Sequence, residues 1–291
     1  MALVLAPLSC SKNKSWGEGL DPELSFVPVV GTLTREETSY TAYPESSTFG
    51  IWEASLEKGK TWSKNHSSAR EDYVNTPVSY SAGIWAPSQN DKIEYGRSLN
   101  LIAYSPYGAN VTIDPAKGIV IENFDIETDD SDIMFAGPVI DYDLSAVSGS
   151  VPLEFTDAFA QVAVYMYSTA KNYQIITVEE VTLSGLRTQG SFAQIPTPEW
   201  TVTGSAKDYE IYSGSQTMTT ELAMVGNEWR VLPQKFDAVL TVKYNVEEND
   251  EVTTKELSVS TPMKWRIGKR CVYVLGINTE NIELIYNSEM L

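Results

Sequence analysis

The residues best suited to chemistry are a run of carboxylates near the middle of the chain. Residues 127–132 read Glu-Thr-Asp-Asp-Ser-Asp, and Asp141 and Asp143 follow shortly after. Paired carboxylates carry out acid–base hydrolysis, and clustered carboxylate oxygens are ligands that Ca²⁺ prefers. The spacing matches no EF-hand loop, and a sequence does not reveal the separation of two carboxylates. A solvated acidic turn is the default interpretation, and a calcium site and a catalytic acid pair are the alternatives.

The remaining chemically active residue types are scarce. His66 is the single histidine, and the two cysteines, Cys10 and Cys271, lie far apart in the sequence. A Ser-His-Asp, Cys-His or multi-histidine metal site would have to be built around one histidine. Cys271 belongs to an apolar run, where a thiol behaves as a small core residue. We therefore expect no disulfide, no structural zinc, no cofactor and no catalytic residue, which argues against an enzyme.

The net charge of the chain restricts the classes of molecule that it is expected to bind. The chain has 291 residues, with 21 basic and 39 acidic side chains and a net charge of −18. Lys and Arg supply most of the affinity for phosphate backbones and anionic lipid headgroups, so neither nucleic acid nor an anionic membrane surface is an expected partner. The hydrophobic fraction of 42% is enough for real cores, and the length fits one large or two ordinary domains.

The N-terminus carries an export signature. Residues 1–8 are apolar, and Ser9 and Cys10 follow at once. This arrangement resembles the end of a bacterial lipoprotein signal peptide, which implies that Cys10 is lipidated and anchors the exported chain in the outer membrane. Residues 11–21 are polar and contain glycine, so residues 1–21 are predicted to form a signal remnant and a tether. No later stretch approaches the length of about 18 apolar residues that a membrane span needs.

The body of the chain alternates apolar and polar residues with the period of a β-strand. Residues 24–30 form the first predicted strand, and Pro28 predicts an edge position for it. The one helical candidate, residues 156–163, is rich enough in β-branched residues to favour a strand. The further predicted strands are 47–56, 78–80, 84–87, 99–106, 119–124, 133–136, 151–155, 159–167, 177–186, 200–203, 228–232, 238–244, 256–259, 271–277 and 282–286.

Short strands separated by Gly, Pro, Asn and Asp turns are typical of β-sandwiches. The small, flexible run at residues 144–150 is a natural division between two domains. The predicted fold is therefore all-β, with two tandem β-sandwich domains at residues 22–147 and 148–291.

Several short motifs occur in a fixed order along the chain. They are Thr34-Arg35, Phe49-Gly50-Ile51-Trp52, Trp85-Ala86-Pro87, Leu101-Ile102-Ala103-Tyr104-Ser105-Pro106, Asp132-Ile133-Met134-Phe135-Ala136, Val151-Pro152-Leu153-Glu154-Phe155, Val181-Thr182-Leu183-Ser184-Gly185-Leu186, Gly190-Ser191-Phe192, Leu232-Pro233-Gln234, Trp265 and Gly268-Lys269. In this order they resemble the Bacteroidales fimbrillin family, whose members build type V pili from lipoproteins with two β-sandwich domains of transthyretin-like, Greek-key type. The resemblance covers nearly the whole mature chain.

The resemblance implies a structural or adhesive pilus subunit at the cell surface, with other subunits as partners and a host or bacterial receptor as a further one. In this family an Arg-specific protease removes the lipidated N-terminus with the first strand, and a strand from a neighbouring subunit fills the groove. Arg35 follows the first predicted strand and is the expected processing site; Arg70 is its rival. The cut would release Phe26, Val27, Val29 and Val30 from the sandwich.

The candidate donor strand is residues 279–291, with Ile282, Leu284 and Tyr286 on one face. An equally good interpretation is that residues 282–286 form the last strand of their own domain. The same sequence therefore leaves open whether the subunit belongs to the stalk, the tip or the anchor of a pilus.

A carbohydrate-binding surface lipoprotein is the alternative function. The chain has seven Trp and 16 Tyr, and Trp52, Trp62 and Trp85 all fall in the first predicted domain. Aromatic rings stack on sugars, although in strand-rich proteins they more often fill the core.

Overall fold

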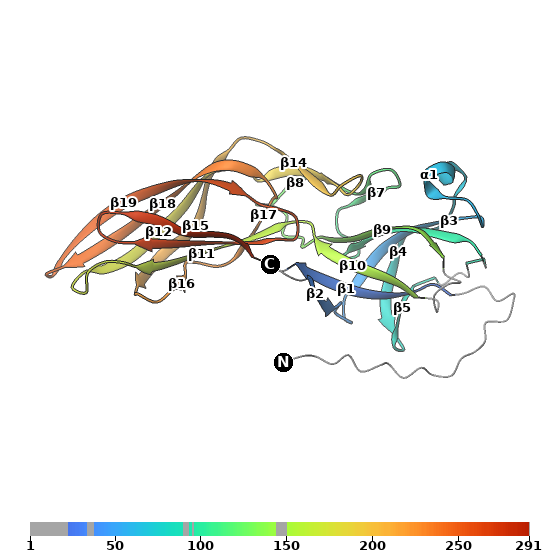
Figure 1. The fold of residues 1–291 in the computed structure, drawn as a ribbon, viewed down its shortest axis with the longest axis horizontal. Coiled ribbons are helices and arrows are strands. Elements are labelled where there is room, and N and C mark those ends of the chain that lie inside the picture. The colour runs from blue at the N-terminus through green and yellow to red at the C-terminus, as the bar shows by residue number, and fades with distance from the viewer. Residues whose placement is uncertain (1–22, 34–37, 90–92, 95, 144–149, 291) are drawn as a thin grey trace.

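The computed structural model describes residues 23–33, 38–89, 93–94, 96–143 and 150–290. Its architecture is all-β, as predicted, and the strands are arranged in two halves along the long axis of the molecule (Figure 1). Two short helical turns, α1 (Trp62–Asn65) and η1 (His66–Ser68), interrupt the strands in the first half. Within the described ranges, no helix has the length and apolar character of a membrane span.

The first half is built on an eight-stranded sheet in the order β10-β9-β6-β3-β4-β5-β1-β2, and an additional pairing of β1 with β10 closes seven of these strands into a ring. Side chains from inside the ring form one core, which includes Phe49, Trp85, Leu101 and Phe155. The strands are β1 (Ser25–Leu33), β2 (Thr38–Ala42), β3 (Thr48–Leu56), β4 (Arg70–Ser81), β5 (Ile84–Pro87), β6 (Ser98–Ser105), β9 (Met134–Asp143) and β10 (Ser150–Asp157).

A second, four-stranded sheet covers part of the outer face of this ring. Its order is β14-β13-β8-β7, with β7 (Thr112–Asp114), β8 (Gly118–Asp125), β13 (Gln189–Ala193) and β14 (Glu199–Thr203). Its core contains Ile121, Phe192 and Trp200 together with Trp52 and Tyr104 from the ring. Strands β3 and β6 are buried on both faces because one face lines the ring and the other meets this sheet.

The apolar run in β3 includes a glycine for a steric reason. Gly50 pairs with Tyr104 of β6, and the phenol ring of Tyr104 lies where a Cβ atom of residue 50 would be. Because real Cβ atoms cannot share that space, a larger residue at position 50 would displace the ring, which explains why the Phe-Gly-Ile-Trp motif and Tyr104 occur together.

The second half is a two-sheet sandwich. One sheet has the order β16-β11-β20-β21, with β17 also paired to β11, and the other has the order β15-β12-β18-β19. The core between them contains Val164, Leu183, Leu240, Tyr244 and Tyr273. The strands are β11 (Ala160–Ser168), β12 (Ile175–Leu186), β15 (Lys207–Met218), β16 (Ala223–Met224), β17 (Trp229–Val231), β18 (Lys235–Glu248), β19 (Glu251–Lys264), β20 (Arg270–Ile277) and β21 (Ile282–Met290).

Each predicted strand overlaps an observed one, and residues 156–163 join the end of β10 to the start of β11 without a helix, as predicted. The sequence patterns missed the short turns α1 and η1 and several edge strands. The longest of these is β15, which has few apolar residues and three register irregularities against β12.

Strand pairing crosses the predicted domain boundary at residues 147–148. Strand β10 lies after that boundary, yet it pairs with β1 and β9 of the first half. Strand β13 pairs with β8, so β13 and β14 also complete the core of the first half. The division of the chain into two tandem domains stays a prediction, whereas the sheets themselves draw on residues from both sides of it.

Candidate functional site

The first strand of the described residues, β1, is held on both of its edges. It runs parallel to β10 from Ser25 to Val30, pairs with β5 at Phe26, and pairs antiparallel with β2 from Val29 to Leu33. The prediction that Pro28 places this strand at a sheet edge is therefore wrong.

The position of Pro28 explains how a proline fits between two neighbours. The N and O atoms of one residue in an extended strand point to the same edge, and the Pro28 carbonyl accepts a 3.4 Å hydrogen bond from Tyr43 N, on the β2 side. The edge of β1 that would carry the missing N–H of Pro28 therefore faces the gap between the residue paired with β5 and the residues paired with β2, where the ladder of hydrogen bonds is interrupted. The absence of this N–H removes no hydrogen bond between β1 and β10.

Alternation along β1 decides which side chains enter the ring. Leu24, Phe26 and Pro28 are buried and Val30 packs against the core, whereas Val27 is 55% exposed. Odd-numbered positions of this strand face outward, so Val27 is not part of the core; the release of Phe26, Val27, Val29 and Val30 from the sandwich stays a prediction. The ring of Phe26 meets Phe49 edge-on, with centroids 5.7 Å apart.

Of the two candidate processing sites, only Arg70 lies among the described residues. Arg35 falls between β1 and β2 and lies outside the described residues, as does Cys10. Arg70 begins β4, pairs with Ser55 of β3, and forms ion pairs with Asp72 (2.6 Å) and Glu94 (3.0 Å).

The candidate donor strand, β21, pairs antiparallel with β20 at the edge of its sheet. Ile282 is buried in the sandwich core, Leu284 packs against that core, and Ile285 is 48% exposed. Tyr286 pairs with Val274 beyond a register irregularity, and its side chain lies outside the described set. β21 is therefore a strand of its own sheet in this structure, and donation to another subunit stays a prediction.

The acidic turn at residues 127–132 is organised by an arginine. Arg230 of β17 donates hydrogen bonds to the carbonyl oxygens of Asp129 (2.9 Å), Asp130 (3.1 Å) and Ser131, and Lys207 forms an ion pair with Glu127. A guanidinium thus occupies three backbone carbonyl groups of the turn. Among the described residues, no group of His, Cys, Asp and Glu side chains is arranged to hold a metal ion.

Behind this turn lies a partly buried carboxyl group that the sequence patterns missed. Burial raises the pKa of Asp157 to about 7; nearby Asp132 also raises it, while a hydrogen bond from Phe159 N (2.8 Å) opposes the shift. Arg230 covers this region, with its guanidinium 4.4 Å from the centre of the Phe159 ring.

Glu53 of β3 is the second missed group. It is 0% exposed, and neither carboxylate oxygen has a hydrogen-bond partner among the described residues. Burial raises its pKa to about 9; Asp72 adds to the rise, and Arg70 and Arg97 oppose it. The available sequence signal was a lone acid in a strand whose other positions are apolar or small.

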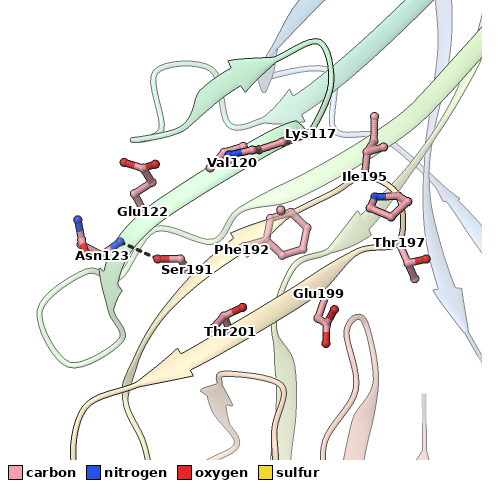
Figure 2. Close-up of a pocket in the computed structure, with 12 residues that line it drawn as sticks. Lys117, Val120, Glu122, Asn123, Ser191, Phe192, Ile195, Thr197, Glu199 and Thr201 are labelled. Carbon is pink, nitrogen blue, oxygen red and sulfur yellow. Dashed lines mark hydrogen bonds between the residues drawn. The ribbon is translucent and has the colours of Figure 1, made fainter.

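A polar cleft of about 560 Å³ lies on the β7–β8–β13–β14 sheet (Figure 2). Glu122, Ser191 and Thr201 line it, and Asn123 N donates a 3.2 Å hydrogen bond to Ser191 Oγ. Phe192 is its one aromatic lining residue and is 1% exposed, so the cleft offers no ring face for stacking.

The three tryptophans of the carbohydrate alternative separate into two environments. Trp52 and Trp62 meet edge-to-face, with centroids 5.8 Å apart, and His66 lies beside Trp62. Trp85 is buried inside the ring against Tyr43 and Phe49, so it is a core residue. Cys271 is likewise buried in the sandwich core.

Comparison with known proteins identifies relatives of this architecture. A family model described as fimbrillin-like matches residues 38–290. No curated protein matches the chain.

Solved structures share the fold at low sequence identity. A fimbrial protein from Bacteroides vulgatus is 15% identical, with a TM-score of 0.64 over 91% of this chain and 99% of that one. A candidate cell adhesion protein from Bacteroides ovatus is 14% identical, with a TM-score of 0.55 over 94% of this chain and 99% of that one. Another from Bacteroides uniformis is 15% identical, with a TM-score of 0.51 over 92% and 98%.

Proposed function

This chain belongs to the fimbrillin-like family, and from that premise we propose that it is a cell-surface pilus subunit that joins its neighbours by exchanging a strand. The family is structural, so the chain is not an enzyme. The observation that carries the proposal is the position of β1, which is the first described strand and is inserted between two partners.

Removal of β1 would leave a groove suited to a replacement strand. The β10 edge from Ser150 to Phe155 would lose its parallel partner, and buried side chains such as Phe49 and Phe155 would lose their cover. An unpaired strand edge above exposed apolar surface is the arrangement that β-augmentation uses, with main-chain hydrogen bonds for affinity and alternate pockets for side chains.

Cleavage after Arg35 would free β1 from β2 because this arginine lies in the connection between them. Arg70 is the weaker candidate, since its backbone is paired in a strand and its side chain is in two ion pairs. Before processing, lipidated Cys10 would hold the precursor in the outer membrane.

The C-terminal strand β21 is the proposed donor. It lies at a sheet edge, which lets it leave without breaking a second ladder, and Ile282 and Leu284 are apolar side chains two residues apart. Leaving β20 would uncover part of the sandwich core, and insertion into a neighbour's groove would offset this by burying the same side chains again.

The test uses the purified full chain and an Arg-specific protease. We expect a new N-terminus at residue 36 and, after release of β1, ladders of oligomers that resist dissociation. Arg35→Ala should block both, and Arg70→Ala should block neither. Oligomers formed equally well by Arg35→Ala would contradict the processing step.

A deletion variant tests the donor strand. Deletion of residues 279–291 should abolish oligomers while the remaining chain keeps a cooperative melting transition. If the deletion prevents folding, β21 is an indispensable strand of its own sheet and the donor must be a different segment.

A further inference from the structure

A second cleft, of about 630 Å³, opens on the first half between the α1–η1 turns and strand β9. Its lining is more aromatic than that of the polar cleft in Figure 2. We call it the tryptophan cleft and define it by the residues Trp52, Trp62, His66, Glu71, Pro138 and Ile140.

The aromatic face of the cleft is held in place. The Trp62 ring, half-buried, meets the buried Trp52 ring at an interplanar angle of 73°. The backbone N of Trp62 donates a 2.8 Å hydrogen bond to Asp141 Oδ1, which ties α1 to β9. Trp62 therefore lines the cleft in a fixed position as a half-buried residue, beside the exposed apolar residues Pro138 and Ile140.

The polar groups of the cleft are hydrogen-bond acceptors. Glu71 Oε1 accepts a 3.0 Å hydrogen bond from Trp52 Nε1, and the second carboxylate oxygen of Glu71 is a further acceptor. His66 Nδ1 lies 3.3 Å from the carbonyl oxygen of Trp62. Since a carbonyl only accepts, Nδ1 carries the proton in the neutral ring, and Nε2 is left as an acceptor.

A ligand for this cleft must combine an apolar face with several donors. A pyranose does so: its C–H face packs on the electron-rich face of an aromatic ring, and its hydroxyl groups donate to a carboxylate and an imidazole nitrogen. The volume lies in the range of ordinary small-ligand sites. We propose that the tryptophan cleft binds a neutral sugar unit of a surface glycan, with Trp62 as the stacking ring and Glu71 as the hydroxyl acceptor.

Charge narrows the ligand class further. Glu71 places a carboxylate at the site, and the whole chain carries a net charge of −18. Glu71 would repel sialylated and sulfated glycans at short range, and the net negative charge of the chain would repel them at long range. Neutral hexoses and N-acetylhexosamines are therefore the expected class. Binding of this kind does not depend on strand exchange and is a property of the unpolymerised chain.

The test is an array of neutral oligosaccharides printed beside their sialylated and sulfated counterparts, probed with the full monomeric chain. Selected neutral glycans are then titrated in solution and followed by tryptophan fluorescence. We expect neutral glycans to bind, Trp62→Ala to weaken the best one at least tenfold, and Glu71→Gln to weaken it several-fold.

Two controls keep the outcome decisive. Tyr173→Ala removes an exposed aromatic side chain of the second half and should leave binding unchanged. If Trp62→Ala fails to fold, Glu71→Gln alone tests the proposal. This variant keeps the local structure because the amide oxygen of the new glutamine can still accept the hydrogen bond from Trp52 Nε1. The proposal is overturned by any one of three results: no neutral glycan binds, both cleft variants bind like wild type, or anionic glycans bind as well as neutral ones.

Discussion

At the residue scale, Glu53 combines complete burial with an ionisable group that has no described partner. Because its pKa is raised to about 9 in the folded protein, it stays protonated there at neutral pH, whereas in the unfolded chain it ionises near the ordinary pKa of a glutamate, 4.5. Between these values the folded state binds more protons than the unfolded state. Its contribution to stability is therefore complete below about pH 4.5 and is lost as pH rises toward 9.

This linkage predicts that Glu53→Gln stabilises the protein, by an amount that grows with pH. The free energies of unfolding of variant and wild type should nearly coincide at the acid end of this window and diverge above it, by at most about 1.4 kcal/mol per pH unit. Urea titrations at a series of pH values measure the difference. The exposed Glu122→Gln is the control and should follow the wild type. A constant difference between Glu53→Gln and wild type would show that the residue does not titrate in this way.

Sequence reasoning did not find Glu53 or Asp157, and the reason is physical. A carboxyl group in the sequence is read by default as solvated, because burial without a partner is costly. Burial of Glu53 results from two cores meeting on either side of β3 and its neighbours, which no local pattern encodes. Similarly, the acidic turn acquires its partner from Arg230, about a hundred residues later in the chain.

At the element scale, two adjacent residues of β1 differ strongly in solvent exposure. Phe26 points into the ring and Val27 points to solvent, although both belong to the same apolar run. Period-two alternation requires this difference, but the sequence Phe-Val-Pro-Val-Val is apolar at both parities and does not reveal which parity is buried.

We predict that Phe26→Ala lowers the free energy of unfolding by about 3–5 kcal/mol, because it leaves a cavity against Phe49. Val27→Ala should cost less than about 1 kcal/mol, since its side chain is mostly in water. Thermal or urea unfolding of the full chain compares the two. Equal losses for both variants would mean that β1 does not hold the register described here.

Prediction succeeded for strands that are buried or half-buried, such as β3, β6 and β12, since their apolar content reflects the core directly. It failed for β15, an edge strand whose side chains are largely polar. Such a strand forms because the edge of β12 offers it backbone hydrogen-bond partners, and this edge exists only once the sheet has assembled.

At the scale of the whole molecule, strands that follow the predicted domain boundary complete the first half. Phe192 and Trp200 come from β13 and β14, yet they complete the core against Phe124 and Phe135 of the first half. Strand β10 likewise supplies Val151, Leu153 and Phe155 to the ring. The first half is therefore incomplete without residues that follow the predicted domain boundary at residues 147–148.

We predict that a fragment of residues 22–147 does not fold on its own. It lacks β10, β13 and β14, so the ring cannot close, and the outer core loses three aromatic residues, Phe159, Phe192 and Trp200. Circular dichroism and proton-exchange measurements should show no cooperative unfolding for the fragment, whereas the full chain should unfold cooperatively. A cooperatively folded fragment would support a self-contained first domain.

The sequence by itself determined the all-β class, the approximate positions of most strands and membership of the fimbrillin-like family, because alternation and short motifs are local properties of the chain. Only the tertiary structure decided that β1 is enclosed by β10, β5 and β2, and that Trp62 is accessible while Trp85 is buried. These outcomes depend on which distant strands pair and which faces are covered, and such long-range contacts leave no periodic trace in the sequence around the residues they affect.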